Sequence, residues 1–357
     1  MYTAPNESLD ALHGGSDPKG SVTVKKLRWG VLGVAKIATE KVVPAMQRGS
    51  HCDVVAIASR DEARAVEAAK TLGLPKAYGS YKALLADPDV DAIYIPLPNH
   101  LHATWTIAAA ERGKHVLCEK PIGMNAAEAE QLIAVRDRAG VTIQEAFMVW
   151  THPQWRRARD IAQSGRIGRV HSYLGYFSYF NDDPANIRNV LDYGGGALMD
   201  IGCYLLVTSR FVFGEEPRRV MGLVERDEAT GTDTLTSMML DFPSGHAVGS
   251  CSTRTVPYQR VQIFGTTGRV EVEIPFNAPP DRPCRVFVDD GRDLFGGGIE
   301  TIALDTCDQY TVQGDLFSRA VLENTEVAYP LEGSLQNMRL IEAVFRSARS
   351  GQWESAG

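Results

Sequence analysis

Near its start the chain reads Arg28-Trp29-Gly30-Val31-Leu32-Gly33-Val34-Ala35-Lys36-Ile37-Ala38. The apolar run that ends at Leu32 has the length of a buried strand, and a helical pattern follows directly after it. Gly33, Ala35 and Ala38 form the spacing G-x-A-x-x-A, a relaxed form of G-x-G-x-x-G. Such a turn needs small residues when backbone amides approach a pyrophosphate at a helix N-terminus. Close packing of a strand on a helix selects the same residues, so the motif alone favours neither explanation.

The alternation of strand and helix continues as far as residue 147. Short apolar runs occupy residues 27–34, 54–59, 92–96, 115–118 and 142–147. Helical patterns lie between them at 37–48, 61–72, 81–86, 101–112 and 125–140. Short apolar runs that alternate with amphipathic helices are typical of βαβ units. The pattern therefore predicts an α/β fold with an N-terminal Rossmann doubly wound parallel sheet.

The pattern changes after about residue 149. A helical pattern at 154–163 precedes strand-like segments at 167–180, 218–226, 233–242, 246–255, 258–265 and 269–274. Turn signals such as Pro243-Ser244-Gly245 separate the strands, as antiparallel hairpins require. Helical patterns at 311–324 and 333–349 close the chain. These features predict a C-terminal α+β domain with an open, mainly antiparallel sheet.

Length and composition support two folded domains between short tails. The chain has 357 residues, whereas a single domain typically has about 150. A hydrophobic content of 44% is ordinary for a globular protein. The expected parts are a disordered tail at 1–24, a Rossmann dinucleotide-binding domain at 25–149, an α+β substrate and oligomerisation domain at 150–350 and a flexible tail at 351–357.

Charge and cysteine usage disfavour several classes of function. The formal net charge of −7, without any basic run, disfavours a nucleic-acid or anionic-membrane partner. The sequence contains no run of about 18 uncharged apolar residues, so it predicts no membrane span. Its first residues are polar and lack the apolar core of a secretory signal. The six cysteines lie far apart without C-x-x-C spacing, which is typical of free thiols in a reducing compartment. We therefore expect a cytoplasmic protein.

The end of the second predicted strand bears on the choice of dinucleotide. Rossmann units that bind NAD usually carry Asp or Glu there, which binds the ribose 2′-hydroxyl. Here the strand ends in Ser59-Arg60, and Arg64 follows one helical turn later. A hydroxyl and guanidinium groups suit a 2′-phosphate, so NADP is the expected cofactor. Asp61 lies next to Arg60 and leaves NAD open as the less favoured alternative, and solvated arginines at a helix start would look the same.

Two polar turns follow predicted strands at the edge where open α/β sheets bind ligands. The first reads Leu97-Pro98-Asn99-His100-Leu101-His102, and the second reads Cys118-Glu119-Lys120-Pro121. A lysine fixed by a following proline in such a turn is a candidate proton donor or electrostatic anchor. A lone lysine is otherwise most often an exposed charge.

Taken together, four segments resemble the glucose–fructose oxidoreductase / inositol dehydrogenase (Gfo/Idh/MocA) family. They are G-x-x-G-x-A at 30–35, Pro-Leu-Pro-Asn-x-x-His at 96–102, Glu119-Lys120-Pro121, and Gly-Gly-Gly-Ala-Leu-Met-Asp-Ile-Gly-Cys-Tyr at 194–204. The resemblance covers about residues 27–350. Inositol-dehydrogenase-like members commonly have His at the last position. Tyr204 therefore places the chain nearer the glucose–fructose oxidoreductase, xylose dehydrogenase and dihydrodiol dehydrogenase branch.

The resemblance implies a role for each matching residue. Lys120 would lie beside the nicotinamide and the substrate hydroxyl, Tyr204 would exchange the proton, and Asp200 would orient Lys120 or bind a substrate hydroxyl. The chemistry agrees, because a phenol with a pKa near 10 is a poor base unless a neighbouring ammonium stabilises its phenolate. The expected cofactor contacts are Gly33, Val34, Ala35, Lys36, Ile37, Ser59, Arg60, Arg64, Leu97, Pro98, Asn99, His102, Glu119 and Lys120.

The loop before the last family segment resembles the substrate side of the site. Asn186 and Arg188 would bind hydroxyls of a polyol, together with Lys120, Asp200 and Tyr204, although an Asx turn with an exposed arginine has the same sequence. The three glycines that follow allow either a close backbone approach to a ligand or a flexible connection.

Two further details of the sequence bear on how far the family's site applies to this chain. Trp150-Thr151 replaces the Tyr-Arg that several relatives carry, which removes a charge near the expected site. His100-x-His102 has a spacing that can bind a metal, but no third ligand stands at a recognisable spacing, and the family turn explains His102. We therefore expect no metal.

Two classes of function remain after this comparison. The first is an NADP-dependent oxidoreductase that acts on a hydroxyl or carbonyl carbon of a sugar, an aldose or related polyol, and it includes a glucose–fructose-type enzyme with tightly held NADP. The second is a non-catalytic dinucleotide-binding regulator, which would be expected to lose the lysine of the Glu-Lys-Pro turn or its acid–base partner. The chain retains Lys120, Asp200 and Tyr204, which favours the enzyme.

The C-terminal sheet also predicts assembly. Segments 235–240 and 247–251 carry apolar side chains in both alternations. An open sheet with helices on one face leaves its other face in need of a partner. We expect a homodimer or homotetramer formed through this sheet.

Overall fold

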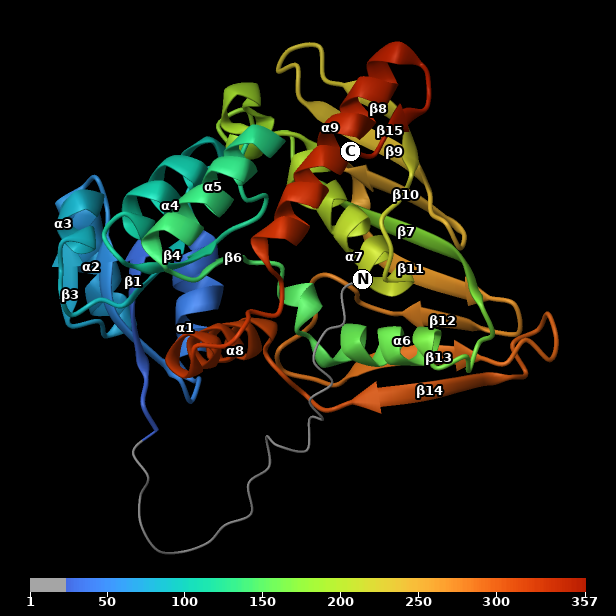
Figure 1. Cartoon of the computed structure of the whole chain (residues 1–357), viewed down its shortest axis with the longest axis horizontal. Coiled ribbons are helices and arrows are strands. Elements are labelled where there is room, and N and C mark those ends of the chain that lie inside the picture. The colour runs from blue at the N-terminus through green and yellow to red at the C-terminus, as the bar shows by residue number, and fades with distance from the viewer. Residues whose placement is uncertain (1–23) are drawn as a thin grey trace, which may run out of the picture.

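The computed structural model describes residues 24–357, so the tail expected at 1–24 lies almost wholly outside the described residues. The chain folds around two β-sheets, one with six strands and one with nine (Figure 1). The first sheet is wholly parallel, and the second is antiparallel except for one pair of strands. The predicted fold class, a Rossmann sheet followed by an open and mainly antiparallel sheet, is confirmed.

The parallel sheet has the strand order β3-β2-β1-β4-β5-β6. Its strands are β1 (Leu27–Leu32), β2 (Cys52–Ala58), β3 (Lys76–Tyr78), β4 (Ala92–Ile95), β5 (His115–Cys118) and β6 (Ile143–Glu145). Helices α1 (Val43–Gln47) and α2 (Glu62–Leu72) cover one face, and the other face carries α3 (Tyr81–Leu85), α4 (His102–Ala110) and α5 (Ala126–Ala139). This order makes β1 and β4 the point where the connections change direction, and ligands of such sheets bind at that point.

Local signals in the sequence fix where the helices of this sheet begin and end. Helix α2 begins at Asp61, whose carboxylate accepts a hydrogen bond from the backbone N–H of Arg64, and it ends at Gly73 with a φ of 67°. Helix α5 begins at Asn125 in the same way and ends at Gly140. Strand β3 was not predicted, because three half-buried residues are too short to show an apolar period.

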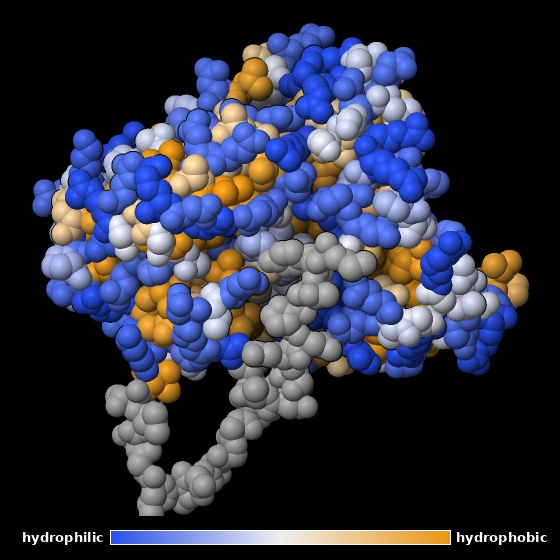
Figure 2. Space-filling model, viewed as in Figure 1, coloured by the Kyte–Doolittle hydropathy of each residue, from blue (hydrophilic) through white to orange (hydrophobic). Residues whose placement is uncertain are grey.

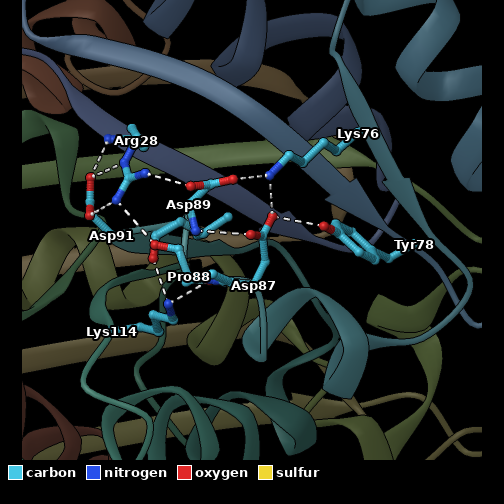
Figure 3. A network of polar contacts seen from close by, with 9 residues as sticks. Arg28, Lys76, Tyr78, Asp87, Pro88, Asp89, Asp91 and Lys114 are labelled. Carbon is cyan, nitrogen blue, oxygen red and sulfur yellow. Dashed lines mark hydrogen bonds and ion pairs between the residues drawn. The ribbon is translucent and has the colours of Figure 1, made fainter.

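A polar network fixes the amino-terminal edge of the parallel sheet (Figure 3). Arg28 of β1 donates to both carboxylate oxygens of Asp91, at 2.9 and 2.8 Å. Lys76 of β3 donates to Asp87 at 2.9 Å and to Asp89 at 2.8 Å. The network therefore ties three strands together at the edge opposite to the one where ligands bind.

The second sheet has the order β14-β13-β12-β11-β7-β10-β9-β8-β15. Its strands are β7 (Val170–Phe180), β8 (Arg219–Arg226), β9 (Asp233–Asp241), β10 (His246–Ser252), β11 (Arg254–Gly265), β12 (Arg269–Val272), β13 (Cys284–Asp289), β14 (Ile299–Leu304) and β15 (Glu354–Ser355). The parallel pair is β7 with β10. Helices α6 (Pro153–Gln163), α7 (Cys203–Phe213) and α9 (Leu331–Ser350) cover one face, as Figure 1 shows.

Three strands of this sheet differ from the sequence prediction. Strands β13 and β14 were not predicted, because glycines and charged residues separate and interrupt their short apolar runs. The segment 351–357, expected to be a flexible tail, contains β15, in which Glu354 pairs with Val220 of β8. That expectation is wrong for residues 354–355, because the free edge of β8 offers backbone hydrogen bonds to the end of the chain.

The chain returns to the Rossmann layer near its end. Helix α8 (Gln309–Glu323) packs on α1 and β1, and the rings of Phe317 and Trp29 lie 5.2 Å apart. The indole N–H of Trp29 donates to Ser318 at 3.0 Å. The two sheets therefore share a core, and α8 contributes to the layer that covers the parallel sheet.

One helical stretch is long and apolar enough to cross a membrane by length and composition alone. It spans residues 191–213 with a mean hydropathy of 1.4, but 89% of its window is buried inside the protein. It contains α7, where every residue from Cys203 to Val212 is buried. The apolar character of this stretch is that of a core helix.

Candidate active site

A large cavity opens between the two sheets, at the carboxyl edge of the parallel strands. Its volume is about 1530 Å³, and both halves of the chain line it. Most of the predicted site residues lie on its wall. These are Val34, Ala35, Lys36, Ile37, Arg64, Leu97, Asn99, His102, Glu119, Lys120, Asn186, Arg188, Asp200 and Tyr204.

The turn after β1 has the geometry expected of a dinucleotide-binding turn. Gly33 has a φ of 116°, which favours glycine, and its N–H donates to the carbonyl of Ala58 at 2.9 Å. A Cβ at this position would lie 2.9 Å from Leu97. Gly33 therefore brings the turn close to the next polar turn, and the small Ala35 leaves room above the helix start.

The residues expected at a 2′-phosphate lie in two different environments. Arg60 and Arg64 are exposed, and Arg64 reaches the cavity wall whereas Arg60 does not line it. Ser59 is buried, and its hydroxyl accepts a hydrogen bond from the N–H of Asp61 at 3.1 Å. Burial raises the pKa of Tyr81, and the charges of Arg60 and Arg64 oppose that rise, so both arginines lie near this ring.

His102 joins the two polar turns. It is fully buried, with Nδ1 2.7 Å from the carbonyl of Pro121 and Nε2 2.6 Å from the carbonyl of Leu97. Burial lowers the pKa of His102 to about 4, against two carbonyl contacts that favour the charged ring. The imidazole therefore holds the two turns together. Asn99 extends this link by donating to the carbonyl of Gly194 at 2.9 Å.

Pro98 does not line the cavity, unlike its neighbours Leu97 and Asn99. It directly precedes the short helical turn Asn99–Leu101. Glu119 lines the cavity, and its carboxylate accepts a hydrogen bond from the hydroxyl of Tyr94 at 2.7 Å. Burial raises the pKa of Glu119, and this hydrogen bond opposes that rise. Glu119 is therefore anchored to β4 from behind the site.

Lys120 and Asp200 form an ion pair on the cavity wall. The ammonium lies 3.2 Å from Asp200 Oδ1 and also donates to the backbone carbonyl of Asp200. Both side chains are 12% exposed. Burial acts to lower the pKa of Lys120, but the nearby acidic groups, chiefly Asp200, together raise the pKa above its usual value. Lys120 is therefore an ammonium at neutral pH.

The other carboxylate oxygen of Asp200 has two donors. The hydroxyl of Tyr179 lies 2.5 Å from Oδ2, and Nε of Arg188 lies 2.9 Å from it. Burial acts to raise the pKa of Asp200, but Lys120, Arg188 and Tyr179 hold it well below its usual value. Asp200 is therefore an anion that binds three other residues of the site, Lys120, Tyr179 and Arg188.

Tyr204 occupies a different environment from Asp200. Its hydroxyl lies 3.4 Å from Sδ of Met148, and its ring packs against Phe147, Phe177 and Phe276. Burial raises the pKa of Tyr204 well above its usual value. A turn of π-helix at Leu198–Gly202 contains Asp200 and leads directly into α7, which carries Tyr204. Asp200 and Tyr204 therefore do not lie on one regular α-helical face, although both reach the cavity.

Sequence reasoning missed Tyr179, Met148 and Tyr94, which contact the predicted residues Asp200, Tyr204 and Glu119. The alternation of β7 carries a signal for the first of them, because Tyr173 and Phe177 are buried and Tyr179 continues the same face. No sequence pattern marks the other two contacts, because they join segments far apart in the chain.

The substrate-side loop is held by its own backbone contacts. The side-chain oxygen of Asn186 accepts a hydrogen bond from the N–H of Arg188 at 3.1 Å, which is the Asx turn considered above. Gly196 has a φ of 120°, and a Cβ there would lie 1.9 Å from a carboxylate oxygen of Asp233. The glycines therefore allow a close approach to Asp233, whose Oδ2 also accepts from the N–H of Leu198.

The family departure at Trp150-Thr151 does not lie on the cavity wall. The ring of Trp150 packs against Phe211 at 4.4 Å and Tyr329 at 4.7 Å, beside a second hollow of about 340 Å³. Neither side chain reaches the cavity wall, and the loss of a charge near the site stays a prediction. Thr151 is buried, and its hydroxyl donates to the carbonyl of Met148 at 3.1 Å.

The structure also shows where the His100-x-His102 pair lies. The His100 ring stacks on Tyr193 at 4.4 Å, whereas His102 is enclosed between carbonyls. Within residues 24–357, no group of three His, Cys, Asp or Glu side chains is arranged to hold a metal ion. Over the same range the six cysteines are unpaired, and five of them are buried.

Comparisons with known proteins agree with this geometry. Residues 27–147 match the model of the oxidoreductase family with an NAD-binding Rossmann fold, and residues 155–271 match the GFO/IDH/MocA C-terminal domain. The chain is 46% identical over 330 residues to an uncharacterized oxidoreductase of Rhizobium meliloti, covering 92% of this chain and 99% of that protein. It is 41% identical over 330 residues to D-xylose 1-dehydrogenase (NADP(+)) 2 of Haloferax volcanii, covering 91% and 98%.

A solved structure shares both halves of the fold. A 3-ketoreductase from Actinomadura kijaniata, in complex with NADP and TDP-benzene, superposes with a TM-score of 0.84 and 30% identity, covering 90% of this chain and 98% of that one. Structures of variants of that ketoreductase, one with lysine changed to alanine and one with tyrosine changed to phenylalanine, match as well. The chain belongs to the Gfo/Idh/MocA family of oxidoreductases.

Proposed function

We propose that the protein is an NADP-dependent oxidoreductase that transfers hydride between the nicotinamide and a hydroxyl or carbonyl carbon of a sugar, an aldose or related polyol. The observation that carries this proposal is the meeting of Lys120, Asp200 and Tyr204 on one cavity wall, directly beside the dinucleotide-binding turn. The relatives point the same way, since they include D-xylose 1-dehydrogenase (NADP(+)) 2 and a 3-ketoreductase crystallised with NADP.

The residues of the N-terminal half fit this cofactor. Residues 34–37 line the cavity beyond Gly33, and backbone amides at such a helix start suit a pyrophosphate. Arg64, supported by Arg60 and Ser59, stands where a 2′-phosphate would be held. The bound nicotinamide supplies or accepts the hydride. Leu97, Asn99 and Glu119 line the cavity together with Lys120 and would form the wall that holds the nicotinamide.

The proton chemistry falls to Tyr204 and Lys120. The phenol of Tyr204 contacts only a thioether among the described polar groups, and a thioether is a weak acceptor. A substrate oxygen in the cavity would therefore compete well for this proton. The ammonium of Lys120 polarises the same oxygen, and Asp200 keeps that ammonium charged and oriented.

The substrate end of the cavity suits a polyhydroxylated molecule. Asn186 and Arg188 line it together with Asp200, and they present amide, guanidinium and carboxylate groups to hydroxyls. The side chain of Arg188 lines the cavity and is 43% exposed while its Nε binds Asp200, which leaves its other two nitrogens as candidate donors to substrate hydroxyls.

The test is steady-state reduction of NADP⁺ over a panel of aldoses and inositols, with oxidation of NADPH over keto-sugars. Turnover of at least one sugar supports the proposal. Absorbance and cofactor extraction of the purified protein show whether nucleotide is retained, as in a glucose–fructose-type enzyme. NADPH binding without turnover of any sugar would reject the enzyme and favour the dinucleotide-binding regulator.

We also propose that the protein forms a homodimer or homotetramer through the nine-stranded sheet. Among the described residues no helix covers the face opposite to α6, α7 and α9. Leu174, Val248 and Met239 lie side by side on that face in three paired strands and are 39–44% exposed. On the face turned to the viewer, Figure 2 shows a mainly hydrophilic surface with scattered apolar patches. The exposed apolar side chains of the uncovered sheet face support a docking surface for a second copy there.

A further inference from the structure

Tyr179 is a second tyrosine of the cavity wall that the proposed reaction does not use. It lies on β7 near the strand's end, where the alternation turns it to the same side as the buried Tyr173 and Phe177. Its hydroxyl donates to Asp200 Oδ2 at 2.5 Å. We propose that Tyr179 is a positioning residue that orients Asp200 and, through it, the ammonium of Lys120. This inference rests on the proposed function, because it assigns a task within that site.

The two carboxylate oxygens of Asp200 have different partners. Oδ1 faces Lys120 at 3.2 Å, while Oδ2 accepts from Tyr179 and Arg188. A carboxylate is planar, so donors that hold Oδ2 also decide where Oδ1 lies. The direction in which Lys120 is held therefore depends on the groups behind the carboxylate.

Of the two donors on Oδ2, Tyr179 is the more firmly held. Its ring comes from a strand that pairs with β10 up to Ser178 and with β11 on either side of Tyr179, at Ser178 and at Phe180. Arg188 comes from a short helical turn in the loop, and its side chain is 43% exposed and has four rotatable bonds. Tyr179 therefore holds Oδ2 in a fixed position, whereas the side chain of Arg188 can move when a substrate binds.

The electrostatic surroundings separate Tyr179 from Tyr204. Burial raises the pKa of Tyr179, and the charge of Asp200 raises it further, against the charge of Arg188. A phenol that hydrogen-bonds a carboxylate stays protonated and serves as a permanent donor. Tyr179 therefore does not exchange a proton with substrate, whereas Tyr204 has no carboxylate on its hydroxyl.

The first test compares Tyr179→Phe with the parent and with Tyr176→Phe. Tyr176 lies three residues earlier on the same strand, and its hydroxyl has a 3.5 Å contact with Thr255 instead of Asp200. We expect kcat to fall about tenfold or more in Tyr179→Phe, the size expected when a hydrogen bond to a charged group is lost. The affinity for NADPH, measured by fluorescence, should change little, and Tyr176→Phe should resemble the parent.

The second test repeats Tyr179→Phe in the Asp200→Asn background. If Tyr179 acts through the carboxylate, its removal there should lower kcat by no more than about twofold, because the two losses are not additive. A merely structural effect on β7 would lower kcat equally in both backgrounds. Equal losses, or parent-like kcat in Tyr179→Phe alone, would overturn the inference.

A third readout does not depend on turnover. Competitive amine labelling followed by mass spectrometry gives the pH at which Lys120 loses its proton. The charged and titratable groups that face this amine are Asp200, Cys203, Arg188 and Glu119, with the Tyr204 ring beside it.

Because Asp200 raises the pKa of Lys120, a loosened Asp200 should let the labelling midpoint fall in Tyr179→Phe but not in Tyr176→Phe. Identical midpoints in all three proteins would reject the positioning role. If no sugar is turned over, the proposed function fails, and the labelling midpoint still decides whether Tyr179 controls the Lys120–Asp200 pair.

Discussion

The ammonium of Lys120 lies 5.1 Å from the centre of the Tyr204 ring, over its face. The hydroxyl of the same ring is directed to the thioether of Met148. The two residues are thus in contact without sharing a hydrogen bond, and the cavity lies beside both. A substrate oxygen that enters there can meet the phenol and the ammonium together, which is the arrangement that hydride transfer at a carbinol carbon needs for its proton.

Replacing Tyr204 by Phe tests the proton partner. The variant keeps the ring contacts with Phe147, Phe177 and Phe276 and removes the acid–base group. We expect kcat to fall by about 10²–10⁴-fold, the usual contribution of general acid–base catalysis, with little change in NADPH affinity. Stopped-flow or steady-state assays measure the first quantity and fluorescence titration the second. Near-parent kcat would discard this mechanism even if the cofactor assignment stood.

Replacing Lys120 by Met tests the ammonium. An ammonium beside the reacting oxygens favours the phenolate of Tyr204, so its loss should raise the pKa of that phenol. Oxidation of the sugar needs the phenolate, and the rising limb of its pH–rate profile should therefore move to higher pH, with kcat reduced by about 10²-fold or more. An unchanged limb would show that Lys120 does not act on Tyr204.

The positions of the cofactor turn and the Glu-Lys-Pro turn could be predicted from the apolar runs of β1 and β5, because each turn follows a strand. The Asp200–Tyr204 segment could be identified only by its resemblance to the family motif, because no helical period was recognised over α7. Tyr179 could be placed on its face by the alternation of β7, but its contact with Asp200 joins two elements that sequence does not bring together. The same holds for Met148 beside Tyr204, and for α8, whose contact with Trp29 depends on how the chain returns.

Replacing Arg60 and Arg64 by Ala, singly, tests the choice of cofactor. An Arg–phosphate contact is worth about 1.5–3 kcal/mol, so each loss should weaken NADP(H) binding roughly tenfold or more and leave NAD(H) binding nearly unchanged. Because Arg64 lies on the cavity wall, its loss should have the larger effect. Arg112→Ala, an exposed arginine away from the cavity, is the matched control. Equal binding of both cofactors by the parent would contradict the assignment.

Replacing Met239 by Arg tests the docking of a second copy. Met239 is 44% exposed and lies between β8 and β10 on the uncovered sheet face. A charge there would be buried without a partner in the assembly, so light scattering at micromolar concentration should give the mass of a monomer. Val66→Arg places the same charge on α2, where Val66 is 53% exposed, and should leave the assembly intact. A monomeric parent would refute the assembly itself.

Replacing Glu145 by Gln tests a buried carboxyl that supports the Glu-Lys-Pro turn. Glu145 is 1% exposed, and its Oε1 accepts a hydrogen bond from the N–H of Ile122 at 2.8 Å. Burial raises the pKa of Glu145 to about 7, above its value in an unfolded chain. The folded state therefore binds this proton more tightly than the unfolded state does.

The sign of the effect on stability follows from that difference. The contribution of Glu145 is fully present below about pH 4.5 and is lost as pH rises to about 7, by an amount on the order of 3 kcal/mol. The Gln variant keeps an oxygen that can accept from the N–H of Ile122, and it cannot ionise. The loss of stability that Glu145 causes as the pH rises should therefore be absent in this variant. Urea unfolding of both proteins between pH 5 and 8 measures the difference. Parallel stability profiles would mean that Glu145 titrates alike in the folded and unfolded chains, and that the turn next to Lys120 is not held by a protonated carboxyl.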